Sequence, residues 1–232
     1  MESKARQIHL KAEEEREKEE FLKALQFLDE ATFLYQEEGD YSGMAEVQSS
    51  RFLTLRHLYE ETGDKNYLVL AGYAARAGVD IARKSAKPEA LAIPLYNYAK
   101  SKQDLGDYQE AVEIYKEALA NMVKNPPKEH NRSSVIDDMT VHMSVCEYLA
   151  GDKSALPRAE KALIELQNDE ESNKYNQDVW VSGGYMDIAK MLIDDDPKRA
   201  REYLEEARKI IDSNPDLIIR RKQWERLKSK IT

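Results

Sequence analysis

Apolar residues recur every three or four positions along almost the whole chain, which is the spacing of amphipathic α-helices. Short polar segments with Gly, Pro, Asn or Asp interrupt this spacing at regular places. No segment shows a convincing period of two, so the pattern indicates an all-α protein without strands. It predicts about ten helices, near 3–37, 41–62, 66–86, 92–105, 108–124, 131–150, 154–168, 174–194, 197–213 and 215–231.

Several of the interruptions carry the side chains that begin helices. Asp107 and Glu110 have the spacing of a capping box, in which two side chains satisfy free backbone N–H groups. Asp196-Pro197 and Asn214-Pro215 place a capping side chain before a proline at the first helical position. Because the connections are short, consecutive helices are expected to pack antiparallel.

A repeat of about 45 residues underlies these helices. Large and small residues recur in one register in both helices of each pair, and a weaker copy lies 43 residues upstream. The first helices contribute Leu95, Tyr98 and Ala99, then Thr140, Met143 and Ser144, then Tyr185, Ile188 and Ala189. The second helices contribute Ala111, Tyr115 and Ala118, then Ala155, Ala159 and Ala162, then Ala200, Leu204 and Ala207. Four units of one helix-pair design account for this register.

Two features break the register. Arg56 stands where the other units have Ala99, Ser144 and Ala189, so either the first of these pairs packs differently or its alignment is shifted by one residue. Gly183-Gly184 lies inside a predicted helix, where each glycine costs about 1 kcal/mol relative to alanine. A kink or a close backbone contact is therefore expected there.

Composition supports the helical interpretation and makes some classes of binding partner unfavourable. Of 232 residues, 34% are charged and 41% hydrophobic, with only nine Gly and seven Pro, a mixture that favours helix. The net charge of −9 disfavours nonspecific binding to nucleic acid or an anionic membrane. The single cysteine and the lack of an apolar leader or membrane span predict a cytoplasmic protein.

The best-formed unit resembles the tetratricopeptide repeat. The residues that carry this resemblance are Leu95, Tyr98, Ala99, Gly106, Tyr108, Ala111, Tyr115 and Ala118, with Pro126 just after the helix. The resemblance covers roughly 49–214 and implies a right-handed α-solenoid of antiparallel helix pairs. The units of 43–45 residues exceed the typical length of about 34, as in long variants of the family.

A solenoid must cover the apolar surface at its two ends. Residues 1–38 are expected to form a charged N-terminal capping helix, whose first 15 residues or so fray or project. Residues 39–214 would form the four pairs, and 215–232 a C-terminal capping helix with a basic outer side, all in a single continuous domain.

Catalytic patterns are scarce. His9, His57, His130 and His142 show no metal-ligand spacing, and phosphate loops and nucleophile elbows are missing from the sequence. Cys146, four residues after His142, is interpreted as a packing residue, and the carboxylate runs as solvated faces or turns. We therefore expect no enzyme activity, no cofactor and no metal site, although His142 facing Asp187 in a pocket would favour an enzyme.

The resemblance also implies a concave groove, lined by the first helices, that receives a peptide or a partner helix. The 45-residue register places two side chains of each first helix toward this groove, beside the small position. These groove positions are Thr54, His57, Asn97, Lys100, His142, Val145, Asp187 and Lys190, and Tyr96 lies next to Asn97. Because only part of the acidic-tail clamp of this family is present, that specificity is not predicted.

The leading hypothesis is a non-enzymatic adaptor that binds a protein or peptide in the groove. A regulatory sensor that acts through a separate partner is the alternative, and an unrecognised enzyme is the weaker one. Self-association is a further possibility, because a capped solenoid still exposes its side and end faces. Nucleic acid and membrane partners are not expected.

Overall fold

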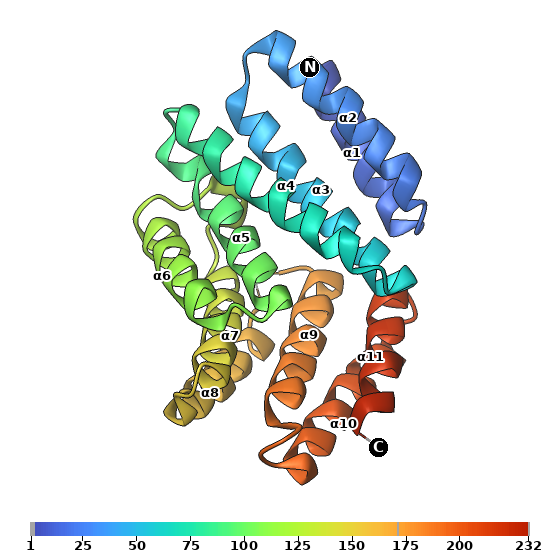
Figure 1. The fold of residues 1–232 in the computed structure, drawn as a ribbon, viewed down its shortest axis with the longest axis vertical. Coiled ribbons are helices and arrows are strands. Elements are labelled where there is room, and N and C mark those ends of the chain that lie inside the picture. The colour runs from blue at the N-terminus through green and yellow to red at the C-terminus, as the bar shows by residue number, and fades with distance from the viewer. Residues whose placement is uncertain (1–2, 171, 232) are drawn as a thin grey trace. The chain divides into compact units, whose positions relative to one another are not determined.

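The structure, a computed structural model, describes residues 3–170 and 172–231. These residues form eleven α-helices and three 3-10 turns, and they contain no strand (Figure 1). The turns are Pro88–Ala90, Lys128–His130 and Lys153–Ala155. The helices are α1 (Lys4–Glu17), α2 (Phe21–Glu38), α3 (Tyr41–Thr62), α4 (Lys65–Lys84), α5 (Ala92–Leu105), α6 (Tyr108–Lys124), α7 (Ser133–Leu149), α8 (Leu156–Gln167), α9 (Lys174–Leu192), α10 (Pro197–Ser213) and α11 (Ile218–Ile231). The prediction of an all-α fold is confirmed.

The helices belong to two compact units, Met1–Glu129 and His130–Thr232. In the first unit, α1 packs on α2, α3 on α4 and α5 on α6, as consecutive pairs. The second helix of one pair also packs on the first helix of the next, α2 on α3 and α4 on α5. In the second unit, α7 pairs with α8 and α9 with α10, and α11 packs on both α9 and α10.

Small residues in the repeat register lie where helices cross. Ala99, Ser144 and Ala189, which share one register position, are all fully buried. Tyr115, the large residue of the best-formed unit, is buried as well, and its hydroxyl donates to Gln103 Oε1 at 2.7 Å. The register read from the sequence therefore marks the packing core, and the buried phenol keeps a hydrogen-bond partner.

The N-terminal segment forms a helix pair, so the expected single helix over 3–37 is wrong. The chain turns between α1 and α2, where Glu19 has a φ of 62° in the left-handed region. Ala5, Ile8, His9 and Ala12 of α1 are buried, which contradicts the expected fraying of this segment in the residues described. Two alanines and one isoleucine suffice because small side chains let α1 approach α2 closely.

Both irregularities of the register have a structural cause. Arg56 forms an ion pair with Asp104, Nη2 to Oδ1 at 3.2 Å, and thereby joins α3 to α5 where the other units have a small residue. A Cβ on Gly183 would lie 2.9 Å from Nη2 of Arg220 in α11, and one on Gly184 would lie 2.8 Å from Cδ1 of Leu163. The glycine pair therefore marks a close contact, as the sequence indicates.

Two of the three helix starts differ from their prediction. Asp196 caps α10 by accepting from the N–H of Arg199 at 3.1 Å, as expected. Asp107 makes no such bond; it and Glu110 instead approach Lys102 Nζ, at 3.7 and 2.8 Å. Near Asn214 the chain first makes a turn, and α11 begins only at Ile218. Charge pairing between neighbouring helices therefore replaces the predicted capping box.

Gly43 in α3 provides a test of this close packing. A Cβ at Gly43 would lie 2.7 Å from Cζ of Tyr35 and still closer to Cε1 and Cδ1, and Tyr35 is itself buried. Because the aromatic ring is rigid, Gly43→Ala should lower the free energy of unfolding by about 2 kcal/mol. Chemical denaturation followed by circular dichroism measures this change.

Gly72 in α4 is the matched control. A Cβ there would meet nothing closer than Cδ1 of Leu105 at 3.9 Å. Gly72→Ala should therefore be neutral or stabilise by up to about 1 kcal/mol, from helix propensity alone. Equal effects of the two substitutions would contradict the packing of Gly43 against Tyr35.

The buried His9 of α1 makes the first unit sensitive to pH. Its Nε2 lies 2.8 Å from Ser50 Oγ and 3.7 Å from a Glu13 carboxylate oxygen. Its Nδ1 has no hydrogen-bond partner among the described residues, so protonation would bury an unsatisfied N–H. Burial first, then the charges of Arg6 and Arg16, lower the pKa of His9 from 6.5 to about 4.

This lowered pKa has a defined consequence for stability. Unfolded chains take up a proton at His9 below about pH 6.5, whereas the folded protein does not until about pH 4. The stability contributed by neutral His9 is therefore complete above pH 6.5 and is lost as the pH falls toward 4. Between pH 7.5 and 5 the loss should be about 2 kcal/mol larger in the wild type than in His9→Gln. Urea unfolding at both pH values tests this, and identical pH dependence of the two proteins would contradict it.

Candidate functional site

The predicted groove residues lie on the first helices of four pairs. Thr54 and His57 are on α3, Tyr96, Asn97 and Lys100 on α5, His142 on α7, and Asp187 and Lys190 on α9. The residues of α3 and α5 belong to the first unit and those of α7 and α9 to the second. Thr54, Tyr96, Asn97 and His142 are buried, whereas His57, Lys100 and Asp187 are half-buried and Lys190 is exposed.

On α3 the two predicted residues take part in helix packing. The hydroxyl of Thr54 donates to the backbone carbonyl of Ser50 at 2.9 Å, one turn earlier in the same helix. The ring of His57 lies 5.7 Å from that of Phe21, centroid to centroid, at the border with α2. Thr54 is therefore bonded within α3, and His57 contacts α2.

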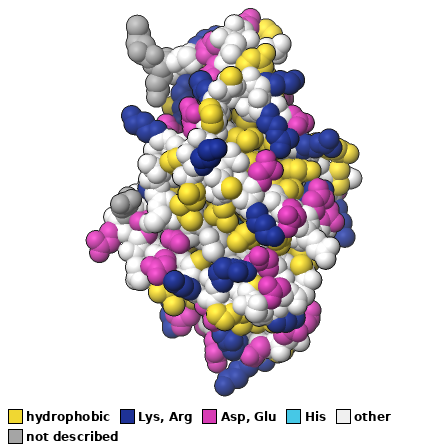
Figure 2. Space-filling view, turned by 90° about the vertical axis from the view of Figure 1, so that its left-hand side faces the viewer, with side chains coloured by type: hydrophobic (Ala, Val, Ile, Leu, Met, Phe, Trp, Pro, Cys, Tyr) yellow, Lys and Arg dark blue, Asp and Glu magenta, His cyan; other side chains and the backbone are white. Residues whose placement is uncertain are grey.

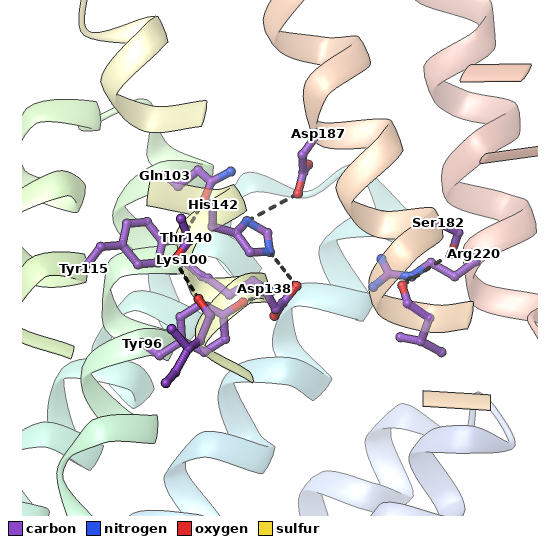
Figure 3. A network of polar contacts seen from close by, with 12 residues as sticks. Tyr96, Lys100, Gln103, Tyr115, Asp138, Thr140, His142, Ser182, Asp187 and Arg220 are labelled. Atoms are coloured by element: carbon purple, nitrogen blue, oxygen red, sulfur yellow. Dashed lines mark hydrogen bonds and ion pairs between the residues drawn. The ribbon is translucent and has the colours of Figure 1, made fainter. Parts of the chain in front are cut away.

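On α5, Tyr96 and Lys100 form a local pair. The ammonium of Lys100 lies 3.3 Å from the Tyr96 hydroxyl and 4.9 Å from the centre of its ring (Figure 3). The Tyr96 ring in turn packs against Tyr115 of α6, with centroids 5.8 Å apart. Since Tyr96 is buried and fixed by Tyr115, the half-buried ammonium of Lys100 is held in one position.

In the second unit, His142 joins α7 to α9. Its Nδ1 lies 3.3 Å from a carboxylate oxygen of Asp187, and its Nε2 lies 3.8 Å from one of Asp138 (Figure 3). A doubly protonated ring can donate to both carboxylates, and a neutral ring to only one of them. Lys190 Nζ binds the other oxygen of Asp187 at 2.9 Å. The exposed ammonium is thus connected, through Asp187, to a buried histidine.

Asp138 is the member of this cluster that sequence reasoning missed. It is buried and lies four residues before His142 on α7, a spacing that places the two side chains on one helix face. The signal was therefore present in the sequence. Only the tertiary fold shows that Asp187 approaches the same ring from α9.

Other candidate chemistry is accounted for by packing and ion pairs. Cys146 is fully buried, in agreement with its interpretation as a packing residue. In the carboxylate run 194–196, the side chains of Lys153 and Tyr148 bind Asp195 and lower its pKa. Among the described residues, no group of three His, Cys, Asp or Glu side chains could hold a metal ion.

Charge is mixed on one face of the molecule. On the face shown in Figure 2, basic, acidic and apolar side chains are interspersed, and neither sign of charge dominates. Such a face lacks the basic stripe that tracks a nucleic-acid backbone. Within the described residues, no helix has the length and apolarity needed to cross a bilayer.

Known proteins resemble this chain in structure rather than in sequence. No protein-family model and no curated protein sequence matches it. A putative kinesin light chain of Podosopora anserina, with nearly identical TPR-like repeats, superposes with a TM-score of 0.56 at 17% identity, covering 92% of this chain and 99% of that one.

Two further solved structures cover the chain almost completely. The Rap protein complexed with competence and sporulation factor has a TM-score of 0.58 at 15% identity, over 100% of this chain and 66% of that one. BtubC (BKLC) from P. vanneervenii has a TM-score of 0.58 at 20% identity, over 97% and 79%. At these identities the likeness concerns the fold alone, and the fold of this chain is that of the tetratricopeptide-like helical repeat proteins.

Proposed function

We propose that the chain is a non-enzymatic interaction scaffold that binds a peptide or protein segment on the accessible side of its first helices. The observation that carries this proposal is a pair of lysines at equivalent register positions, Lys100 on α5 and Lys190 on α9. Each ammonium is held by a neighbouring side chain, Tyr96 or Asp187, and remains reachable from solvent. A helical repeat fold whose structural neighbours include a Rap protein complexed with competence and sporulation factor supports the same conclusion.

The chemistry of the two lysines favours an acidic segment. A partner carboxylate at Lys100 gains an ion pair with an ammonium that Tyr96 already orients, so little side-chain entropy is lost on binding. At Lys190 a partner carboxylate competes with Asp187, whose charge is shared with the His142 ring. Each lysine is a cationic contact within its own unit, and the aromatic ring of Tyr96 adds selectivity to the contact at Lys100.

A regulatory sensor is the second candidate, favoured by the connection between Lys190 and His142. An acidic ligand that withdraws Lys190 from Asp187 changes the charge that α9 presents to His142 of α7. Binding at the surface would thus alter a buried contact between two helices, which a separate partner could recognise.

An enzyme is the weaker candidate. His142 does face Asp187, the arrangement that would favour catalysis, but the side chain of His142 is only 7% exposed and lies between two carboxylates. A general base must reach the proton that it removes from a substrate. The burial of His142 fits a contact between helices better than a catalytic role.

Charge reversal of the two lysines tests the scaffold proposal. Peptides selected on the wild-type protein from a displayed random library should be enriched in Asp and Glu. Lys100→Glu with Lys190→Glu should weaken their binding by about tenfold or more, because the attraction becomes a repulsion. Titration of labelled peptides by fluorescence anisotropy measures the change.

The matched control reverses two exposed lysines of second helices, one in each unit. Lys65→Glu on α4 and Lys161→Glu on α8 change the net charge by the same amount away from the proposed face. This control should bind the selected peptides as the wild type does. Selection of no peptide, or equal weakening by both double variants, would contradict the proposal.

A further inference from the structure

Two helices near the ends of the chain, α2 and α11, expose outer faces of opposite charge. Helix α2 contains four acidic residues and one basic residue, and α11 contains six basic residues and one acidic residue. The excess of basic residues in α11 contrasts with the net charge of −9 of the whole chain. Large apolar side chains are exposed on both helices, Leu22 and Phe33 on α2 and Ile218 on α11.

The outer face of α2 is acidic and apolar. Leu22 is 65% exposed and Phe33 60% exposed, and eleven residues separate them, which is close to three full helical turns. Glu30 and Glu37 project within about 80° of Leu22 around the helix axis, and both are exposed. Asp29, about 20° from Leu22, is exposed as well and forms an ion pair with Arg51 of α3. The opposite side of α2 packs inside its own unit through Ala24, Leu28, Ala31 and Tyr35.

The outer face of α11 is mainly basic, and it also contains the exposed Glu225, about 20° from Ile218 around the helix axis. Ile218 is 50% exposed, and Lys222 and Arg226 follow it one and two turns later, within about 80° around the axis. The inner side of α11 is committed to its own unit by Trp224, Leu227 and Ile231. The indole N–H of Trp224 donates to the carbonyl of Leu204 in α10 at 2.8 Å, which fixes the rotation of α11.

The exposed apolar side chains of the two outer faces lie outside the buried clusters of their own units. The inner sides of α2 and α11 already supply the buried apolar contacts of these helices, so Leu22, Phe33 and Ile218 are not needed for folding. Exposed apolar side chains beside charge that is mainly of one sign are typical of a surface that binds a partner of the opposite sign.

We infer that these two faces bind each other between two copies of the chain. The acidic face of α2 in one copy packs on the basic face of α11 in the next, with Leu22 and Phe33 against the region of Ile218, and Glu30 and Glu37 against Lys222 and Arg226. The two surfaces differ, so the contact is heterologous and joins copies head to tail. The assembly uses the outer faces of α2 and α11 and is independent of the peptide-binding function proposed for the first helices.

Charge reversal of one face at a time tests this inference. In the first variant, Glu30→Lys with Glu37→Lys makes both faces basic; in the second, Lys222→Glu with Arg226→Glu makes both acidic. The wild type should associate as its concentration rises, and less so at high salt. Each variant alone should associate at least about tenfold more weakly, because like charges then meet. Sedimentation velocity measures the association, and circular dichroism verifies that each variant is folded.

Mixing the two variants is the decisive step. The second variant keeps the acidic α2 face and the first keeps the basic α11 face, so an equimolar mixture contains one native contact and should associate again. An exposed aromatic residue on another helix, Tyr73 of α4 (66% exposed), supplies the control, since Tyr73→Ser should leave association unchanged. A wild type that is monomeric at every concentration, or a mixture that fails to associate, would overturn the inference, as would loss of association in the control.

Discussion

Close approach of helices at small residues is the constraint on which the rest of the structure depends. Ala99, Ser144 and Ala189 occupy one register position, and each lies fully buried where two helices meet. Where a large side chain enters such a crossing, the facing residue is a glycine, as with Tyr35 over Gly43 and Arg220 over Gly183. Interiors packed at crystal-like density leave no room for a further methyl group at these points. The repeat is therefore a repeat of small residues more than of apolar ones.

The sequence predicted the helices in the middle of the chain well, because two independent signals indicate them: the repeated small residues and the glycine-containing turns between helices. Gly106, for example, ends α5 with a φ of 85°, a conformation that other residues avoid. The N-terminal pair escaped prediction because Glu19, a residue without turn preference, adopts the left-handed conformation between α1 and α2. The predicted capping box failed for another reason, since Lys102 of the preceding helix offers Glu110 a stronger, charged partner than a backbone N–H.

The sequence predicted which helices carry the candidate residues, but not how deeply each of these residues is buried. Register arithmetic placed Thr54, Asn97 and His142 on the open side of the first helices, and all three are buried. First helices pack on one another within each unit, α3 on α5 and α7 on α9, so these positions lie between helices. The position three residues later carries lysine on α5 and α9, and those side chains are long enough to reach solvent. A residue pattern indicates which face of a helix a side chain lies on, whereas the burial of that side chain depends on how closely the next helix approaches.

Buried polar pairs give the first helices a defined alignment that alanine packing alone cannot supply. Alanines on successive turns of a helix present nearly the same surface, so two helices packed through them could shift by one turn and lose little apolar contact. His9 of α1 meets Ser50 of α3 at 2.8 Å, Arg56 of α3 meets Asp104 of α5, and His142 of α7 meets Asp187 of α9. A shift of one turn would leave the buried His9 and His142 and the half-buried Arg56 without these partners, which costs more than the pairs contribute when formed. Within each unit, polar side chains between first helices therefore fix where the lysine of a first helix reaches the surface, so the packing of the interior positions the candidate binding residues of that unit.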